Sequence, residues 1–343
     1  MLTVLPSQNY WFPGHANHRE IFDFTGNILN IETPGFPLAP HDSNNFGNVI
    51  TLENESGYYI IGKYLMDNNF SVVTGSDGIF DNVPSDIPCC TFAPDMSNPA
   101  AAHLYYIDEE GLHYGHISKN IAKESTISAP VLVSLPLPPD KDSPLCILGD
   151  GSGTGNWLFY SSGEKDTHVI AAAYCEADSV LCVESTVLNN ENNIINIDIC
   201  QNRISLLTQN ADLMYGTLSA ADNKMSVDID YTINNLSSDC IQTAFSSSAS
   251  SLFWLTKNME GCAINQLNYL TGEVVTTTVK GDYIALKCGP DNIIYGLDRR
   301  ELGSSTLLTI MPDDDLGTYS IAEISLATSG GYFPATGWFA YNA

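Results

Sequence analysis

The stretch IALKCGPDNIIYGLDRRELGSSTLLTI, residues 284–310, decides the fold of this chain. It contains three short, mainly apolar runs, IALKC, IIYGLD and TLLTI, which the turn-forming segments GPDN and RRELGSS separate. Apolar runs of this length between glycine-containing turns are typical of β-strands rather than helices. Because the runs are apolar on both faces, we expect their sheet to be covered on each side by a similar sheet.

Similar units recur from before residue 60 to the last residue, and each combines a short apolar strand, a turn and an aromatic-rich strand. The aromatic strands begin near Tyr58, Leu104, Trp157, Leu213, Leu252, Ile293 and Trp338. The intervals between them are 46, 53, 56, 39, 41 and 45 residues, a period typical of the four-stranded blades of β-propellers. We therefore predict an all-β chain with little helix, folded as one seven-bladed β-propeller domain over residues 1–343.

The two ends of the chain are predicted to share the last blade. The aromatic strand at Trp338 lies close to the C-terminus, and residues 20–33 hold two strand-like runs around the turn TGN. Strands from residues 20–33 would complete the blade that Trp338 begins, and this closure would remove exposed sheet edges. The alternative is an eighth blade made by residues 20–33; we favour seven, because so short a blade would be incomplete.

The period and the closure resemble the seven-bladed β-propeller superfold, but no signature of one family accompanies them. The sequence also lacks a G-x-S-x-G elbow, a Walker loop and a dinucleotide-binding glycine motif. Because this fold hosts many functions, the fold alone does not decide between them. The missing motifs favour a non-catalytic recognition propeller, for protein interaction or assembly, over an enzyme. A carbohydrate-binding, lectin-like propeller and a calcium-dependent hydrolase or lactonase are the alternatives.

The chain is strongly acidic, with 40 Asp and Glu against 13 Lys and Arg and a formal net charge of -27. Such a charge repels nucleic acid and anionic lipid, so the expected partners are proteins or glycans and not nucleic acid. No apolar run is long enough to span a membrane. The N-terminus lacks the pattern of a signal peptide, which predicts a cytoplasmic location or export by an unconventional route. The nine cysteines are expected to be free, mostly buried thiols.

One glycine-rich segment is a candidate metal site. Side-chain oxygens recur at alternate positions in Asp150, Ser152, Thr154 and Asn156, which is the arrangement in the first half of a calcium loop. Calcium is therefore the only cofactor that the sequence suggests, and no catalytic residue is predicted. The alternative is an ordinary glycine-rich turn between strands.

Aromatic residues outside the predicted strands are the candidate binding surface. They are Tyr10, Trp11, Phe12, Tyr332 and Phe333. We also expect the long connections at residues 84–102, 127–144 and 178–193 to be loops at one mouth of the ring. His113 and His116 lie three residues apart on a predicted strand and should therefore point to opposite faces.

Overall fold

The computed structural model contains 27 β-strands and no helix in the residues that it describes. These residues are 10–11, 21–23, 30–32, 48–51, 57–61, 64–67, 69, 71–84, 89–150, 155–164, 167–188, 192–221, 224–234, 236, 240–258, 261–298, 305–313 and 318–326. Within these ranges, no helix has the length and hydrophobicity needed to cross a membrane. The predicted all-β fold class is confirmed.

The strands form antiparallel sheets that follow one another along the chain. The first two sheets have three strands each: β1 (Tyr10–Trp11), β2 (Ile21–Asp23) and β3 (Asn30–Glu32), then β4 (Asn48–Thr51), β5 (Gly57–Ile61) and β6 (Tyr64–Asp67). The third sheet has five: β7 (Cys90–Pro94), β8 (Ala102–Asp108), β9 (Gly111–Lys119), β10 (Ser125–Ile127) and β11 (Val131–Leu132).

The remaining sheets have four strands each, paired in chain order. One contains β12 (Cys146–Gly149), β13 (Asn156–Glu164), β14 (Thr167–Glu176) and β15 (Ser179–Leu188). The next contains β16 (Ile194–Cys200), β17 (Arg203–Thr208), β18 (Leu213–Ala221) and β19 (Lys224–Ile233). Then come β20 (Ala244–Phe245), β21 (Ser251–Asn258), β22 (Gly261–Asn268) and β23 (Val274–Val279). The last described sheet contains β24 (Tyr283–Cys288), β25 (Ile294–Asp298), β26 (Ser305–Asp313) and β27 (Thr318–Leu326).

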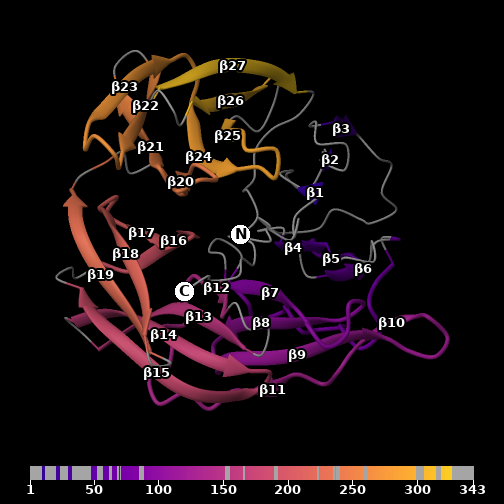
Figure 1. Ribbon diagram of the computed structural model, residues 1–343. Coiled ribbons are helices and arrows are strands. Elements are labelled where there is room, and N and C mark those ends of the chain that lie inside the picture. Colours follow the sequence, from indigo (N-terminus) through magenta and orange to yellow (C-terminus); the bar gives the residue numbers. More distant parts are fainter. Residues whose placement is uncertain are drawn as a thin grey trace.

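The sheets are arranged around a common centre (Figure 1). The first strands of neighbouring sheets contact one another in series: β1 with β4, then β7, β12, β16, β20 and β24. The last strands, such as β15, β19, β23 and β27, lie at the periphery (Figure 1). In the four sheets from β12 to β27, the shorter first strands therefore lie nearest the centre and the longer last strands lie at the periphery.

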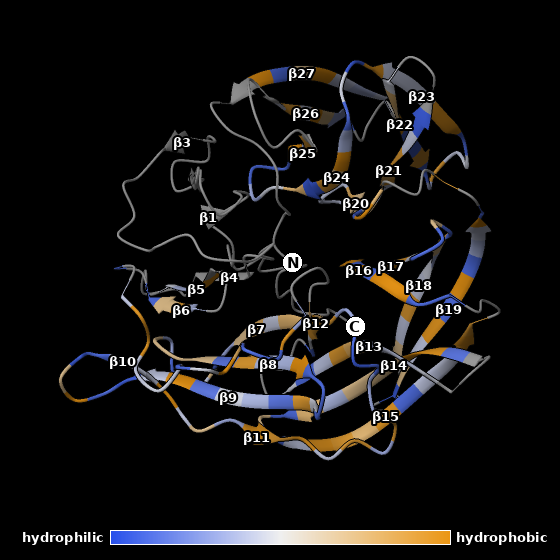
Figure 2. Ribbon diagram, turned by 180° about the vertical axis from the view of Figure 1, so that it is seen from behind, coloured by the Kyte–Doolittle hydropathy of each residue, from blue (hydrophilic) through white to orange (hydrophobic). Residues whose placement is uncertain are grey.

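The hydrophobic core lies between neighbouring sheets. Phe159 and Ile197, for example, belong to one cluster between the β12–β15 and β16–β19 sheets, whereas Tyr105 and Tyr160 fill the preceding gap between sheets. Burying each such side chain contributes about 1.5–3 kcal/mol. The peripheral strand β19 instead alternates between apolar and polar residues, as its colours show (Figure 2). The sheets thus stabilise one another through their faces, as predicted for the repeat.

Most predicted aromatic strands are the second strands of their sheets. Tyr58, Leu104, Trp157 and Leu252 lie in β5, β8, β13 and β21. Leu213 differs, because it begins β18, which is the third strand of its sheet. The first strand there is β16, whose sequence IINIDIC has no aromatic residue, and this strand was not recognised as the start of a unit.

All three predicted loops contain strands, although residues 127–144 include only the end of β10 and the two-residue strand β11. Residues 178–193 include the ten-residue strand β15, and residues 84–102 include the first strand β7. The prediction of long loops at these positions is therefore wrong. Residues 180–183 of this strand form the apolar run VLCV, and its residues alternate between exposed and partly buried, as in a peripheral strand.

The predicted hairpin near the N-terminus is present, with Ile21 paired to Glu32 across β2 and β3. Strand β1 pairs with β2 on the other side. Trp338 lies outside the described residues, so a last blade shared by the two chain ends stays a prediction. The single-domain assignment likewise stays a prediction.

Candidate functional site

One edge of the sheets carries several polar side chains that could act on a ligand. Strands alternate in direction within each sheet, so the turns after its first and third strands lie at the same edge. Contacts between sheets keep these edges together: the Tyr105 hydroxyl donates to the Ala177 carbonyl at 2.9 Å, and the Cys200 thiol donates to the Ser246 carbonyl at 3.4 Å. We call this edge the first-turn face.

Two histidines lie side by side where the third sheet reaches the first-turn face. His103 on β8 pairs directly with His116 on β9, and their ring centroids are 5.5 Å apart. His103 Nδ1 is 2.9 Å from the Tyr114 hydroxyl, and His116 Nε2 is 3.0 Å from Asp95 Oδ2. We call these four residues the His103–His116 site.

Burial keeps His103 neutral. Desolvation lowers the pKa of its imidazole to about 4; Asp95 opposes this shift and His116 adds to it. Burial also raises the pKa of Tyr114 to about 12, with further contributions from Asp178 and Asp95. At neutral pH both groups are uncharged, so their hydrogen bond joins a neutral imidazole to a neutral phenol. When the Tyr114 hydroxyl donates to Nδ1, Nε2 of His103 carries the remaining proton and is a donor.

Asp95 is held in its ionised form beside His116. Burial alone would raise the pKa of this carboxyl, but hydrogen bonds from Ser97 and His116 outweigh that effect and hold the pKa below its usual value. The Ser97 backbone N–H and hydroxyl both donate to Asp95 Oδ1, at 2.9 and 2.6 Å. The fixed carboxylate orients the His116 ring, whose side chain is 33% exposed. A histidine that a carboxylate orients in this way has the arrangement of a general base.

The predicted calcium segment is described only at its two ends. Asp150 Oδ2 accepts a hydrogen bond from the Tyr174 hydroxyl at 2.6 Å, and the backbone N–H of Asp150 donates to the Gly155 carbonyl. Asn156 is buried at the start of β13, and Ser152 and Thr154 lie outside the described residues. In the described part of the chain, no three His, Cys, Asp or Glu side chains are placed to hold a metal ion. Calcium binding here stays a prediction.

The predicted aromatic surface lies mostly outside the described residues. Tyr10 and Trp11 form strand β1, paired with Asp23 and Phe22, rather than a segment outside the strands. Phe12, Tyr332 and Phe333 are not among the described residues. Their role as a contact surface stays a prediction.

The His103–His116 site was not predicted from the sequence. The prediction that His113 and His116 face opposite ways fits their separate partners, since His113 bonds to Asp108 at 2.9 Å and stacks on Tyr106. The missing information was the partner strand. A two-residue turn pairs Asp108 with Gly111, and this register brings His103 opposite His116.

A buried ion pair links two first strands. Lys287 Nζ on β24 lies 3.5 Å from Asp198 Oδ1 on β16, and both side chains are about nine-tenths buried. The Phe245 backbone N–H on the intervening strand β20 donates to Asp198 Oδ2 at 3.3 Å. One carboxylate therefore connects three sheets.

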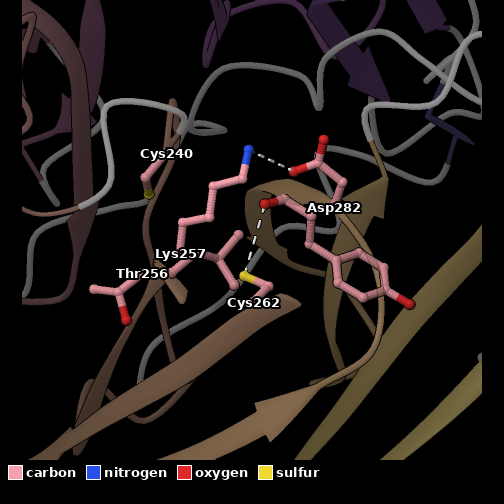
Figure 3. Close-up of a pocket in the computed structure, with 7 residues that line it drawn as sticks. Cys240, Thr256, Lys257, Cys262 and Asp282 are labelled. Atoms are coloured by element: carbon pink, nitrogen blue, oxygen red, sulfur yellow. Dashed lines mark hydrogen bonds and ion pairs between the residues drawn. The ribbon is translucent and has the colours of Figure 1, made fainter. Parts of the chain in front are cut away.

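The pocket in Figure 3 lies at the opposite edge of the ring, where β21 ends and β24 begins. Lys257 Nζ lies 3.3 Å from Asp282 Oδ1 above Cys262. Burial is the main cause that raises the pKa of Cys262 to about 12 and that of Cys240 to about 11, so both thiols are protonated at neutral pH. The pocket has no internal space for even a water molecule. It therefore has no room for a small-molecule ligand.

The sequence matches no protein-family model and no curated protein. Three solved structures illustrate its structural similarity. A candidate 6-phosphogluconolactonase from Bacteroides uniformis has a TM-score of 0.56 and 11% identity, covering 94% of this chain and 98% of that one. The periplasmic gluconolactonase PpgL of Pseudomonas aeruginosa has a TM-score of 0.51 and 9% identity, covering 95% and 97%.

The third is the β-propeller domain of Cps50 (Swd1) from Myceliophteria thermophila, with a TM-score of 0.51 and 12% identity, covering 93% of this chain and 97% of that one. At such low identity these similarities concern the fold and not the activity. Together with the antiparallel sheets that surround a common centre (Figure 1), they show that the chain has a β-propeller fold.

Proposed function

We propose that the chain is a closed, seven-bladed β-propeller that hydrolyses a neutral sugar lactone at the His103–His116 site. The observation that carries the proposal is the pairing of a neutral imidazole with a second, carboxylate-held imidazole, with ring centroids 5.5 Å apart. The imidazole of His103 can donate a hydrogen bond, and the imidazole of His116 can accept a proton. The structural similarity to lactonases supports this reaction class by analogy only.

His116 is the general base in this proposal. The Nε2–H of His116 donates a hydrogen bond to Asp95, so Nδ1 of His116 is left to take a proton from water. The water oxygen then forms a bond to the lactone carbonyl carbon. His103 donates from Nε2 to the developing oxyanion, as a neutral imidazole can. The ring C–O bond breaks, the proton on His116 passes to the leaving alkoxide, and the product is a hydroxy acid.

The net charge of the chain limits the kinds of lactone that can be substrates. A net charge of -27 disfavours the approach of a phosphorylated lactone. Asp95 within the site repels a phosphate group in the same way. We therefore expect an unphosphorylated aldonolactone to be the better substrate.

The test is hydrolysis of glucono-1,5-lactone by the purified chain. It is measured as the rate of acid release above the spontaneous rate. We expect His116→Gln to lower kcat/KM by about 10²–10⁴, the usual contribution of a general base. His103→Phe should lower it by about 10²–10³, because a donor to the oxyanion is lost. His113→Gln is the matched control, since His113 bonds to Asp108 instead. Hydrolysis that is absent, or equal in His116→Gln and the unsubstituted protein, would exclude the proposal.

A non-catalytic role in protein recognition is the second candidate. It is favoured by apolar side chains that are exposed on peripheral strands, among them Leu181 and Val187 on β15 and Val274 on β23. This role would be supported if the chain hydrolyses no lactone but binds a protein partner. Leu181→Asp should then abolish that binding without changing the melting temperature. Normal lactone hydrolysis by the same variant would assign the activity to the first-turn face instead.

A further inference from the structure

We propose a second binding site, for neutral carbohydrate, on the peripheral strand β19. Its centre is Tyr231, whose side chain is among the most exposed of the large apolar residues, at 65%. The ring stacks on Tyr215 with a centroid distance of 5.4 Å and an interplanar angle of 25°. Tyr215 is itself buried, so it supports Tyr231 from below while the other ring face stays open to solvent.

A β-bulge places Tyr231 there. Tyr215 pairs with Tyr231, but Gly216 pairs with Ile229, which leaves Asp230 as an extra residue in β19. Ile229 packs against the β12–β15 side of its sheet, whereas Tyr231 stacks on Tyr215, which belongs to the cluster on the β20–β23 side. Residues two apart in a regular strand share a face, so the bulge has reversed the direction of Tyr231.

The bulge also depends on a glycine. A Cβ atom at Gly216 would lie 1.9 Å from the Asp228 carbonyl oxygen, which no side chain could tolerate. The close backbone approach therefore fixes the bulge at this position. Bulges of this kind commonly re-aim side chains at functional sites.

Charged groups that can bond to hydroxyls are supplied by Asp230, the residue before Tyr231, and by its partner Arg203. Asp230 Oδ2 is 3.9 Å from Arg203 Nη1, and both side chains remain partly exposed, at 39% and 26%. The Arg203 guanidinium also lies over the Tyr269 ring, 4.2 Å from its centroid. This cation–π contact holds the guanidinium in place before any ligand arrives. The site thus offers a fixed fork of donors, a carboxylate acceptor and an open aromatic face.

These features together fit a pyranose. The apolar face of a sugar ring can stack on Tyr231, while neighbouring hydroxyls donate to Asp230 and accept from Arg203. A tyrosine already held by its neighbours loses little conformational freedom on binding. The ligand should be uncharged, because Asp228 and Asp230 and the net charge of -27 oppose sulfated or carboxylated glycans.

The test is isothermal titration of the full chain with neutral trisaccharides of glucose, galactose and N-acetylglucosamine, and with a sulfated oligosaccharide. We expect at least one neutral probe to bind and the sulfated one to bind more weakly. Tyr231→Ala should weaken binding by at least about tenfold, or about 1.4 kcal/mol. Tyr231→Phe should retain it within about threefold, because the stacking face is kept.

The matched control is Val275→Ala, an exposed position on the peripheral strand of the next sheet. Melting temperatures should be unchanged in all variants, since the substituted side chains are exposed. Failure of every neutral probe, equal binding by Tyr231→Ala, or tighter binding of the sulfated probe would each overturn the proposal. Lactone hydrolysis is a separate measurement: His116→Gln should leave sugar binding at Tyr231 intact, and Tyr231→Ala should leave hydrolysis intact.

Discussion

The hydroxyl of Ser125 donates a hydrogen bond to Asp67 Oδ2 at 3.2 Å, and this buried contact joins the second sheet to the third. The other oxygen of Asp67 accepts from the backbone N–H groups of Asn69 and Ser71, at 2.9 and 3.1 Å. The adjacent backbone reinforces the junction, because Thr74 exchanges hydrogen bonds with the chain at Ser125 and Ile127. Asp67 therefore organises a junction between two consecutive sheets, through a residue 58 positions further along the chain.

We predict that Asp67→Ala destabilises the protein by about 1–3 kcal/mol, because three donors lose their acceptor in a buried place. Urea unfolding of the two proteins measures the difference. Asp77→Ala is the control, since Asp77 is exposed in the following turn. Equal unfolding midpoints for Asp67→Ala and the unsubstituted protein would show that the junction does not depend on this carboxylate.

Stability should fall on acidification because of His103. Its pKa in the folded protein is about 4, below the value of about 6.5 for an unfolded histidine. Between these two pH values the unfolded chain binds a proton that the folded chain does not, so stability is full above pH 6.5 and is lost as the pH falls toward 4. The loss attributable to this residue is of order 3 kcal/mol at most.

The measurement is the free energy of unfolding between pH 4.5 and 7.5. His103→Gln should have a flatter profile than the unsubstituted protein, because glutamine takes up no proton. Asp95 stays ionised over this range, because its pKa is held below its usual value. The comparison between the two proteins, rather than the slope of either, isolates the contribution of His103. Parallel profiles would show that His103 is more accessible to protons than its burial implies.

The repeat was predictable from the sequence because aromatic second strands such as that of Trp157 are buried between sheets and therefore strongly apolar. The β16–β19 sheet was harder to place. Its first strand alternates Asn196 and Asp198 with isoleucines, and Asp198 bonds to neighbouring first strands rather than to solvent. Burial of polar groups by pairing across sheets leaves no pattern in a single strand.

Neither proposed site could be found by local pattern. The pairing of His103 with His116 depends on the two-residue turn at Glu109 and Glu110, where a shift of one residue would separate the rings. The exposure of Tyr231 depends on the bulge at Asp230. Both are matters of register, which tertiary packing sets and which strand propensity does not encode.

Calcium should raise the melting temperature if the segment from Asp150 to Asn156 binds it, because a ligand that binds only the folded state stabilises it. At a concentration a hundredfold above Kd the gain is about 2.7 kcal/mol. Scanning calorimetry with calcium, magnesium and chelator measures the effect, and Asp150→Asn should abolish it. Tyr174→Phe is informative as well, since it frees Asp150 Oδ2 from its 2.6 Å hydrogen bond. Identical melting in calcium and chelator would exclude the metal site.

Removing one member of the ion pair between Asp198 and Lys287 should destabilise the folded protein. Lys287→Met leaves a buried carboxylate without its cation, and we predict a loss of about 3–5 kcal/mol. Asp198→Asn combined with Lys287→Met removes both charges, and replacing a buried pair in this way is often nearly neutral. The double variant should therefore be more stable than Lys287→Met alone. Chemical unfolding of the two single variants, Asp198→Asn and Lys287→Met, and of the double variant measures the coupling. Purely additive losses would mean that water, rather than Lys287, compensates the charge of Asp198.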